Sequence, residues 1–198
     1  WVFDSARKAG DSAVVASDSN CYVVVFRSVG RQEYATKDVR HILFKVDESA
    51  LDSEAETYEA DLQAAKDAAK TAAEDALAQW KAGEATEDSF AALANELSAD
   101  AGSNTNGGLY TKIYKNQMVT EFNDWCFDAS RQSGDTGIVY GESSNYKGYH
   151  VIYFVGDDVP YWQVQAENAL RNTDTEAWLD GLLDSADVVQ EAGMKHVG

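Results

Sequence analysis

A short pattern that occurs twice constrains this chain more than any other feature of its sequence. Trp1-Val2-Phe3-Asp4 recurs as Trp125-Cys126-Phe127-Asp128. In both copies an arginine, a Gly-Asp pair, an apolar pair and a β-rich run follow in the same order. Internal self-similarity of this kind usually indicates duplicated units, so two unrelated helix–turn–hairpin segments are the weaker interpretation. We therefore expect two related segments, each containing a turn followed by a β-hairpin.

The two copies stand in different surroundings along the chain. The second copy closes a larger domain, expected at residues 34–157, and residues 158–198 follow it as a helical segment. Residues 1–33 are expected to be the C-terminal remnant of a preceding repeat. A hairpin this short cannot bury a core. We expect it to dock on the rest of the chain or on a neighbouring molecule, which includes self-association.

Hydrophobic periodicity between and after the two copies predicts an α+β fold with a small antiparallel sheet. A capping-box pattern, Ser53 with Glu56, predicts the start of a long helix that ends before Gly83. The elements expected in chain order are a strand at 39–46, that helix at 53–82, a shorter helix carrying Phe90 and Leu97, a loop at 98–108, a helix at 119–130, strands near 137–140 and 149–154, a helix at 162–186 and a short strand at 187–197.

Charge and composition exclude several classes of function. The 198 residues include 34 acidic and 16 basic ones, and the formal net charge is −18. Such a surface repels phosphate backbones, so nucleic acid and anionic lipid are not expected partners. No stretch approaches the roughly 20 apolar residues of a membrane span. Cys21 and Cys126 lack zinc spacing, so neither a metal nor another cofactor is expected; we expect two small buried side chains and leave a disulfide open.

Five short motifs in one order resemble the parvulin (PpiC-type) family of peptidyl-prolyl cis/trans isomerases. They are Val39-Arg40-His41-Ile42-Leu43, Phe90-Ala91-Ala92-Leu93-Ala94, Ser98-Ala99-Asp100-Ala101-Gly102-Ser103 with Gly107-Gly108-Leu109, the pair Met118 and Phe122, and Gly148-Tyr149-His150-Val151-Ile152. The resemblance implies a four-stranded antiparallel sheet flanked by helices. It also makes residues 1–33 the remnant of a degenerate parvulin-like repeat, and the chain as a whole resembles bacterial extracytoplasmic foldases with tandem rotamase domains.

The resemblance implies a role for six side chains. It gives catalytic roles to His41, Asp100 and His150, and places Leu109, Met118 and Phe122 around the proline ring of the substrate. Three features depart from the family pattern: Tyr110 follows Leu109, one residue is inserted before Met118, and Lys147 replaces a small hydroxyl residue.

Structural explanations compete with each of these roles. The two histidines can brace the fold through a mutual hydrogen bond, and this explanation stands level with direct catalysis. Met118 and Phe122 can be plain core residues, as a Met–aromatic pair on a helix usually is. Asp100 can be a turn residue, because aspartate is common in turns, and His196 is expected on the surface without a partner.

These residues suit an isomerase acting on X-Pro bonds of unfolded or extended proteins. Peptide-bond rotation faces a barrier of about 18–20 kcal/mol, and because no bond is broken we expect a non-covalent twisted-amide mechanism. The alternatives are a chaperone-like peptide-binding module with little turnover and a structural spacer. The segment 45–52 has one lysine against three acidic residues, which predicts substrates without phosphate. The resemblance also implies a secreted or cell-surface location.

Overall fold

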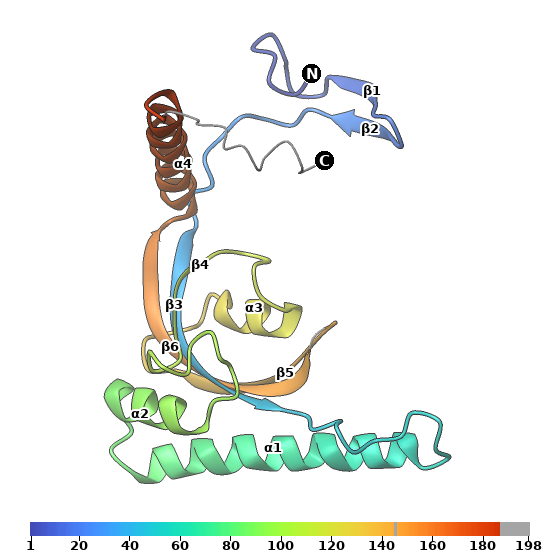
Figure 1. Cartoon of the computed structure of the whole chain (residues 1–198), viewed down its shortest axis with the longest axis vertical. Coiled ribbons are helices and arrows are strands. Elements are labelled where there is room, and N and C mark those ends of the chain that lie inside the picture. Colours follow the sequence, from blue (N-terminus) through green and yellow to red (C-terminus); the bar gives the residue numbers. More distant parts are fainter. Residues whose placement is uncertain (145, 187–198) are drawn as a thin grey trace, which may run out of the picture. The chain divides into compact units, whose positions relative to one another are not determined.

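The computed structural model describes residues 1–144 and 146–186 and divides into two compact units, Trp1–Glu33 and the chain from Tyr34 onward. Each unit has its own β-sheet, coloured blue in the first unit and light blue to orange in the second (Figure 1). The strand expected at 187–197 and His196 lie outside the described residues.

The sheet of the larger unit has four antiparallel strands in the order β4-β3-β6-β5. The strands are β3 (Ala35–Lys45), β4 (Leu109–Ile113), β5 (Thr136–Ser143) and β6 (Tyr146–Pro160). β3 and β6 occupy the centre, and their β-branched and aromatic residues suit a sheet that is covered on both faces. The expected α+β fold with a four-stranded antiparallel sheet is confirmed, and three of the strands extend beyond their predicted ends.

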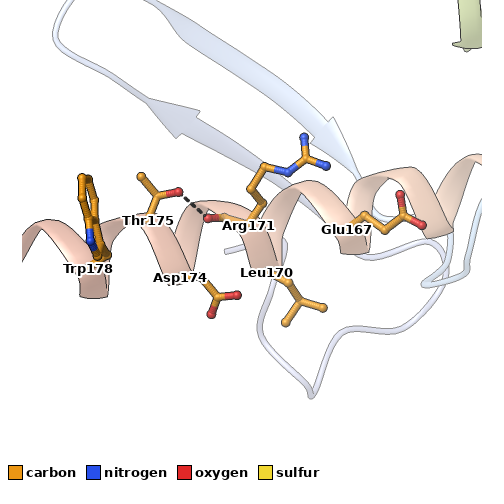
Figure 2. A pocket seen from close by; sticks show the side chains of 6 residues that line it. All are labelled: Glu167, Leu170, Arg171, Asp174, Thr175 and Trp178. Carbon is orange, nitrogen blue, oxygen red and sulfur yellow. Dashed lines mark hydrogen bonds between the residues drawn. The ribbon is translucent and has the colours of Figure 1, made fainter.

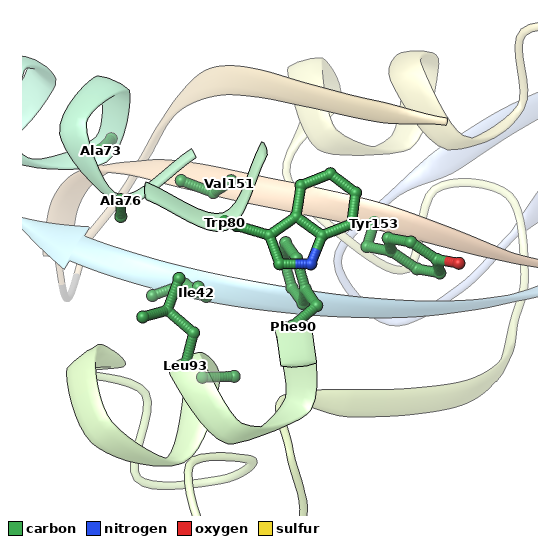
Figure 3. Close-up of a cluster of buried hydrophobic side chains, with 9 residues drawn as sticks. Ile42, Ala73, Ala76, Trp80, Phe90, Leu93, Val151 and Tyr153 are labelled. Atoms are coloured by element: carbon green, nitrogen blue, oxygen red, sulfur yellow. The ribbon is translucent and has the colours of Figure 1, made fainter. Parts of the chain in front are cut away.

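Helices cover the two faces of this sheet. α1 (Tyr58–Ala82) and α2 (Glu87–Leu97) lie on one side, and α3 (Thr120–Cys126) lies on the other (Figure 1). The cluster on the α1 side includes Ile42, Ala73, Ala76, Trp80, Phe90, Leu93, Ala94, Val151 and Tyr153 (Figure 3). Small alanines bring α1 close to the sheet, and the Trp80 indole donates a hydrogen bond to the Thr86 carbonyl at 2.9 Å, which links α1 to the start of α2.

Two helices begin or end at other residues than the sequence pattern predicts. α1 begins at Tyr58, so Ser53 and Glu56 form no capping box. The Asp52 carboxylate instead accepts the N–H of Glu54 at 3.0 Å, and local bonds of this kind compete with helix formation. α3 ends at Cys126, four residues early, and the Asp128 carboxylate then accepts the N–H of Ser130 at 2.9 Å.

The helix that follows the sheet, α4 (Tyr161–Asp184), forms as expected but has no buried residue. Most of its large apolar side chains are exposed, including Leu170 and Trp178. Within residues 1–144 and 146–186 no helix is long and apolar enough to span a membrane. Both cysteines are free thiols, and the prediction of burial holds for Cys126 but is wrong for Cys21, which is exposed.

The smaller unit is a hairpin of β1 (Ser12–Ala16) and β2 (Cys21–Val25). Its strands pair in the same register as β5 and β6: Ser12 lies opposite Val25, as Thr136 lies opposite Tyr153. The repeat in the sequence is therefore a repeat in structure.

Candidate active site

Two neighbouring strands bring the two expected histidines together. His41 of β3 lies opposite Ile152 of β6, and Leu43 lies opposite His150, so the histidines are diagonal neighbours. Their Nδ1 atoms are 3.1 Å apart and their rings stack at 5.3 Å. Both are almost fully buried. Both rings also contact Phe122 of α3, which places them on the α3 side of the sheet.

The loop at 98–108 carries Asp100 to these histidines along the outer edge of β3. There, Leu43 N–H donates to the Ser98 hydroxyl at 3.1 Å, and His41 N–H donates to the Gly108 carbonyl at 2.9 Å. Gly108 has φ +69°, and a Cβ atom at this position would lie 2.2 Å from the His41 carbonyl oxygen. Only glycine fits this close approach, so the Gly-Gly motif serves to bring the loop against the strand.

Asp100 is held as a carboxylate by several donors. Its Oδ2 atom lies 2.9 Å from His41 Nε2 and also accepts the hydroxyls of Ser103 and Tyr110, the latter at 3.0 Å. Its Oδ1 atom accepts the N–H of Gly102 at 3.2 Å. The hydrogen bond from His41 is the largest of the causes that hold the pKa of Asp100 well below its ordinary value, and the other donors add to it. Asp100 therefore carries its negative charge at the pH of cells.

The network of hydrogen bonds continues from Asp100 through both histidines. Since the Asp100 carboxylate only accepts, His41 Nε2 carries a hydrogen and donates it to Asp100, and His41 Nδ1 shares a hydrogen bond with His150 Nδ1. The other nitrogen of the His150 ring, Nε2, is hydrogen-bonded to the Tyr146 hydroxyl at 3.1 Å. Burial lowers the pKa of His150 to about 3, so this ring is neutral. A chain of hydrogen bonds therefore links Tyr146 through both imidazoles to Asp100.

A cavity of about 210 Å³ opens beside this network. The side chains that line it are His41, Leu43, Lys45, Asp100, Tyr110, Met118, Tyr146 and His150. Of the three residues expected around a proline ring, Met118 lines the cavity directly. Phe122 is fully buried and packs edge-on against both imidazoles, at 5.7 Å and 5.3 Å, so it supports the site without lining it.

Leu109 lies outside the cavity, and its neighbour Tyr110 lines it. Both belong to β4, where successive side chains point to opposite faces. If Tyr110, and not Leu109, takes the lining position of the family pattern, the spacing from this position to Met118 needs no inserted residue. That apparent insertion was the signal in the sequence that could have identified Tyr110. The contributions of Ser103 and Tyr146 were missed although both contacts are local. Ser103 donates to Asp100 three residues away in the same loop, and Tyr146 is hydrogen-bonded to His150 four residues away in β6.

A larger hollow of about 550 Å³ lies on α4 but has no comparable chemistry. All of its lining side chains come from this single helix, as Figure 2 shows for Glu167, Leu170, Arg171, Asp174, Thr175 and Trp178. The one hydrogen bond drawn there joins the Thr175 hydroxyl to the Arg171 carbonyl at 2.8 Å and belongs to the helix itself. Among the described residues, no group of His, Cys, Asp or Glu side chains could hold a metal ion.

Comparison with known proteins identifies related sequences and structures. Residues 22–157 match the family of PPIC-type PPIase domains. The peptidylprolyl isomerase PrsA from Bacillus cereus is 24% identical, over 81% of this chain and 54% of that one, with a TM-score of 0.42. A structure from a study of PEB4 and the periplasmic protein Cj1289, SurA-like chaperones of Campylobacter jejuni, is 23% identical, over 79% and 56%, with a TM-score of 0.41. The chain thus spans about half the length of each, and no curated protein matched it.

Proposed function

This chain belongs to the parvulin-type family of PPIC-type PPIase domains, and we propose that it is an active isomerase of X-Pro bonds in unfolded or extended proteins. The observation that carries the proposal is the cavity in which an apolar wall meets a charged, fully hydrogen-bonded network. The apolar wall suits a proline ring, and the network suits the amide bond that precedes it.

The chemistry needs little beyond this arrangement. Because rotation about an X-Pro bond breaks no covalent bond, the site has to favour a twisted amide over the planar one. Met118 is adaptable and Tyr110 presents an aromatic ring, so together they can grip the proline. A twisted amide loses resonance and places more electron density on its nitrogen, and the ordered dipoles of His41 and Asp100 are fixed before substrate arrives. No nucleophile is required.

The alternative is a chaperone-like module that binds extended chains without useful turnover. Burying polar groups in a binding surface brings a cost in desolvation, which a purely apolar groove avoids. Here His41, His150 and Ser103 are all nearly inaccessible to solvent. Because peptide binding alone does not need such a network, its presence favours catalysis over simple holding.

We propose that substrates need no phosphate. Lys45 is the one lysine or arginine among the described residues that line the cavity. The nearby Lys147 is neutralised by Glu48, at 2.7 Å. A phosphate before the proline would thus meet one cation in a strongly acidic protein, where recognition of a dianion generally uses several. Matched Ser-Pro and phosphoSer-Pro peptides test this, and faster isomerisation of the phosphorylated peptide would contradict it.

We also propose the domain limits 1–33, 34–157 and 158–198 and an extracytoplasmic location, both of which rest on the sequence pattern and the family resemblance. Expression of residues 34–157 alone tests the limits, since an independent domain would unfold cooperatively. Fractionation of the source cells tests the location.

A protease-free isomerisation assay of the full chain tests the main proposal. Asp100→Asn keeps the shape of the side chain and removes its charge, and we expect the rate on an X-Pro peptide to fall at least about tenfold, which corresponds to about 1.4 kcal/mol. Asp75→Asn, on the exposed side of α1, is the matched control and should leave the rate unchanged. Equal rates for the wild type and Asp100→Asn would contradict the proposed role of this site.

A further inference from the structure

The hairpin of β1 and β2 repeats the turn geometry of the β5–β6 hairpin bond for bond. Gly10 N–H donates to the Phe26 carbonyl at 2.9 Å, and Gly134 N–H donates to the Phe154 carbonyl at 2.9 Å. The two glycines have φ values of +95° and +91°. Such agreement places Phe26 at the structural position of Phe154.

The two hairpins are also braced in the same way. Arg7 donates through Nε to the Trp1 carbonyl at 3.1 Å and lies 4.3 Å over the Trp1 ring. Arg131 donates through Nε to the Trp125 carbonyl at 3.1 Å and lies 4.3 Å over the Trp125 ring. The first hairpin thus has the local structure of the closing hairpin of a parvulin fold.

The two hairpins differ in what covers them. Since their strand registers coincide, Val23 corresponds to Val151, and Val25 corresponds to Tyr153. Val23 and Val25 are 81% and 61% exposed, whereas Val151 and Tyr153 are 0% and 8% exposed. The first hairpin therefore exposes to solvent an apolar surface that its counterpart buries.

In the larger unit, β3 completes the hairpin by pairing along the edge of β6 that faces away from β5. The corresponding edge of β2 has no partner strand among the described residues. Phe26 N–H bonds towards β1, and since N–H groups alternate along a strand, those of Val23 and Val25 point to the open edge. An open edge with apolar side chains is a template for another strand.

We infer that the open edge of β2 is a strand-docking site, and that its occupant is the opening strand of a second parvulin-type fold. The β3 strand of this chain cannot be the occupant, since β4 and β6 already pair with its two edges. The occupant is therefore a separate segment with apolar residues where β3 has Val39 and Ile42, which are fully buried. Tyr22 stands where the larger unit has His150, so the completed second fold lacks the histidine pair.

A peptide with the β3 sequence, residues 35–45, tests this site on the full chain. We expect hydrogen exchange at the Val23 and Val25 amides to slow at least tenfold when the peptide is added, with no change from a peptide of scrambled order. Val23→Pro removes one N–H at the open edge, a position where an edge strand tolerates proline, and should abolish the protection. The Phe26 amide, which bonds to β1, reports whether the hairpin of this variant is intact.

Three results would overturn the inference. In the first, neither valine amide gains protection from the β3 peptide. In the second, protection rises with protein concentration alone, which would make a second copy the occupant. In the third, the scrambled peptide protects equally well, which would make the edge a general client site. The isomerisation rate is measured in parallel. Because the docking site and the cavity use different residues, failure of docking with normal isomerisation leaves the proposed function standing, and the reverse also holds.

Discussion

The two hairpins of this protein share a local structure and differ in what surrounds them. In both, an arginine braces a tryptophan, and a glycine with positive φ closes the turn. Only the second is completed by β3. Only there does the strand position that corresponds to Tyr22 carry a histidine, His150, which joins a buried network. The comparison teaches that the short repeat encodes a hairpin, whereas the site arises from the strand and loop packed against it.

The largest effect is expected when the second hairpin is made to resemble the first. His150→Tyr breaks the hydrogen bonds to His41 and Tyr146. The larger ring also lacks space, because His150 packs against Gly141, where even an added Cβ atom would lie 3.0 Å from His150 Nε2. We expect a loss of about 3 kcal/mol or more in the free energy of unfolding, and no measurable isomerisation. Chemical denaturation measures the first quantity.

The reciprocal change supplies the control. Tyr22→His alters an exposed residue of the first hairpin, and we expect a change within about 0.5 kcal/mol. If both substitutions had the same small effect, the histidine network would contribute nothing that the first hairpin lacks.

The pH dependence of stability should separate the two hairpins next. Burial lowers the pKa of His150 to about 3, whereas an unfolded histidine titrates near about 6.5. The unfolded state thus binds more protons, so the contribution of His150 is complete above about pH 6.5 and is lost as the pH falls towards 3, by at most about 1.4 kcal/mol per pH unit. Denaturation at a series of pH values should show this slope, and His150→Gln should flatten it. A wild-type curve that is level from pH 6.5 to 4 would rule out a buried neutral His150.

A smaller effect distinguishes the two candidates for the cavity wall. Tyr110→Phe removes one of the donors to Asp100, and we expect a loss of about 1.5 kcal/mol in stability and a severalfold lower kcat/KM. Leu109→Ala should leave kcat/KM unchanged, because Leu109 does not line the cavity. The opposite ranking of the two variants in kcat/KM would restore the original assignment of Leu109.

The smallest expected effect compares the two bracing arginines. Arg131→Ala removes a hydrogen bond and a cation–π contact on Trp125, which packs over Gly137, and should lower the stability of the larger unit by about 1 kcal/mol. Arg7→Ala should leave the unfolding of that unit unchanged. Unfolding followed by amide exchange in β6 measures both, and equal losses would show that the two hairpins are energetically coupled.

The fold was predictable where the pattern is local and periodic. The repeat, the sheet, α2 and the existence of the two strands that carry His41 and His150 follow from apolar spacing and short motifs, although both strands begin earlier than predicted. The start of α1 was not predictable in this way, because the Asp52 carboxylate accepts the backbone N–H of Glu54, which competes with helix formation there. The exposure of Cys21 was missed for a different reason: apolar neighbours indicate burial only where a partner strand covers them.

The site was predictable only in part. His41, Asp100 and His150 were identified from motifs. In the structure His41 is hydrogen-bonded to both of the others, to His150 through Nδ1 and to Asp100 through Nε2. The cavity-lining position of β4 was assigned to Leu109 instead of its neighbour Tyr110, because the sequence alone does not show which face of β4 looks into the cavity. Tyr146 and Ser103 lie only four and three residues from the partners that they bond, His150 and Asp100, but a single hydroxyl side chain in a strand or loop leaves no periodic trace in a sequence.

Exchange NMR of a peptide with one X-Pro bond, mixed with isotopically labelled full chain, tests the central claim most directly. We predict that cis–trans exchange of the peptide accelerates at substoichiometric protein, and that the shifted amide resonances centre on Tyr110, Met118 and Tyr146. Exchange at the uncatalysed rate, or shifts centred on the β1–β2 hairpin, would contradict the claim that the second hairpin and its cavity form an isomerase site.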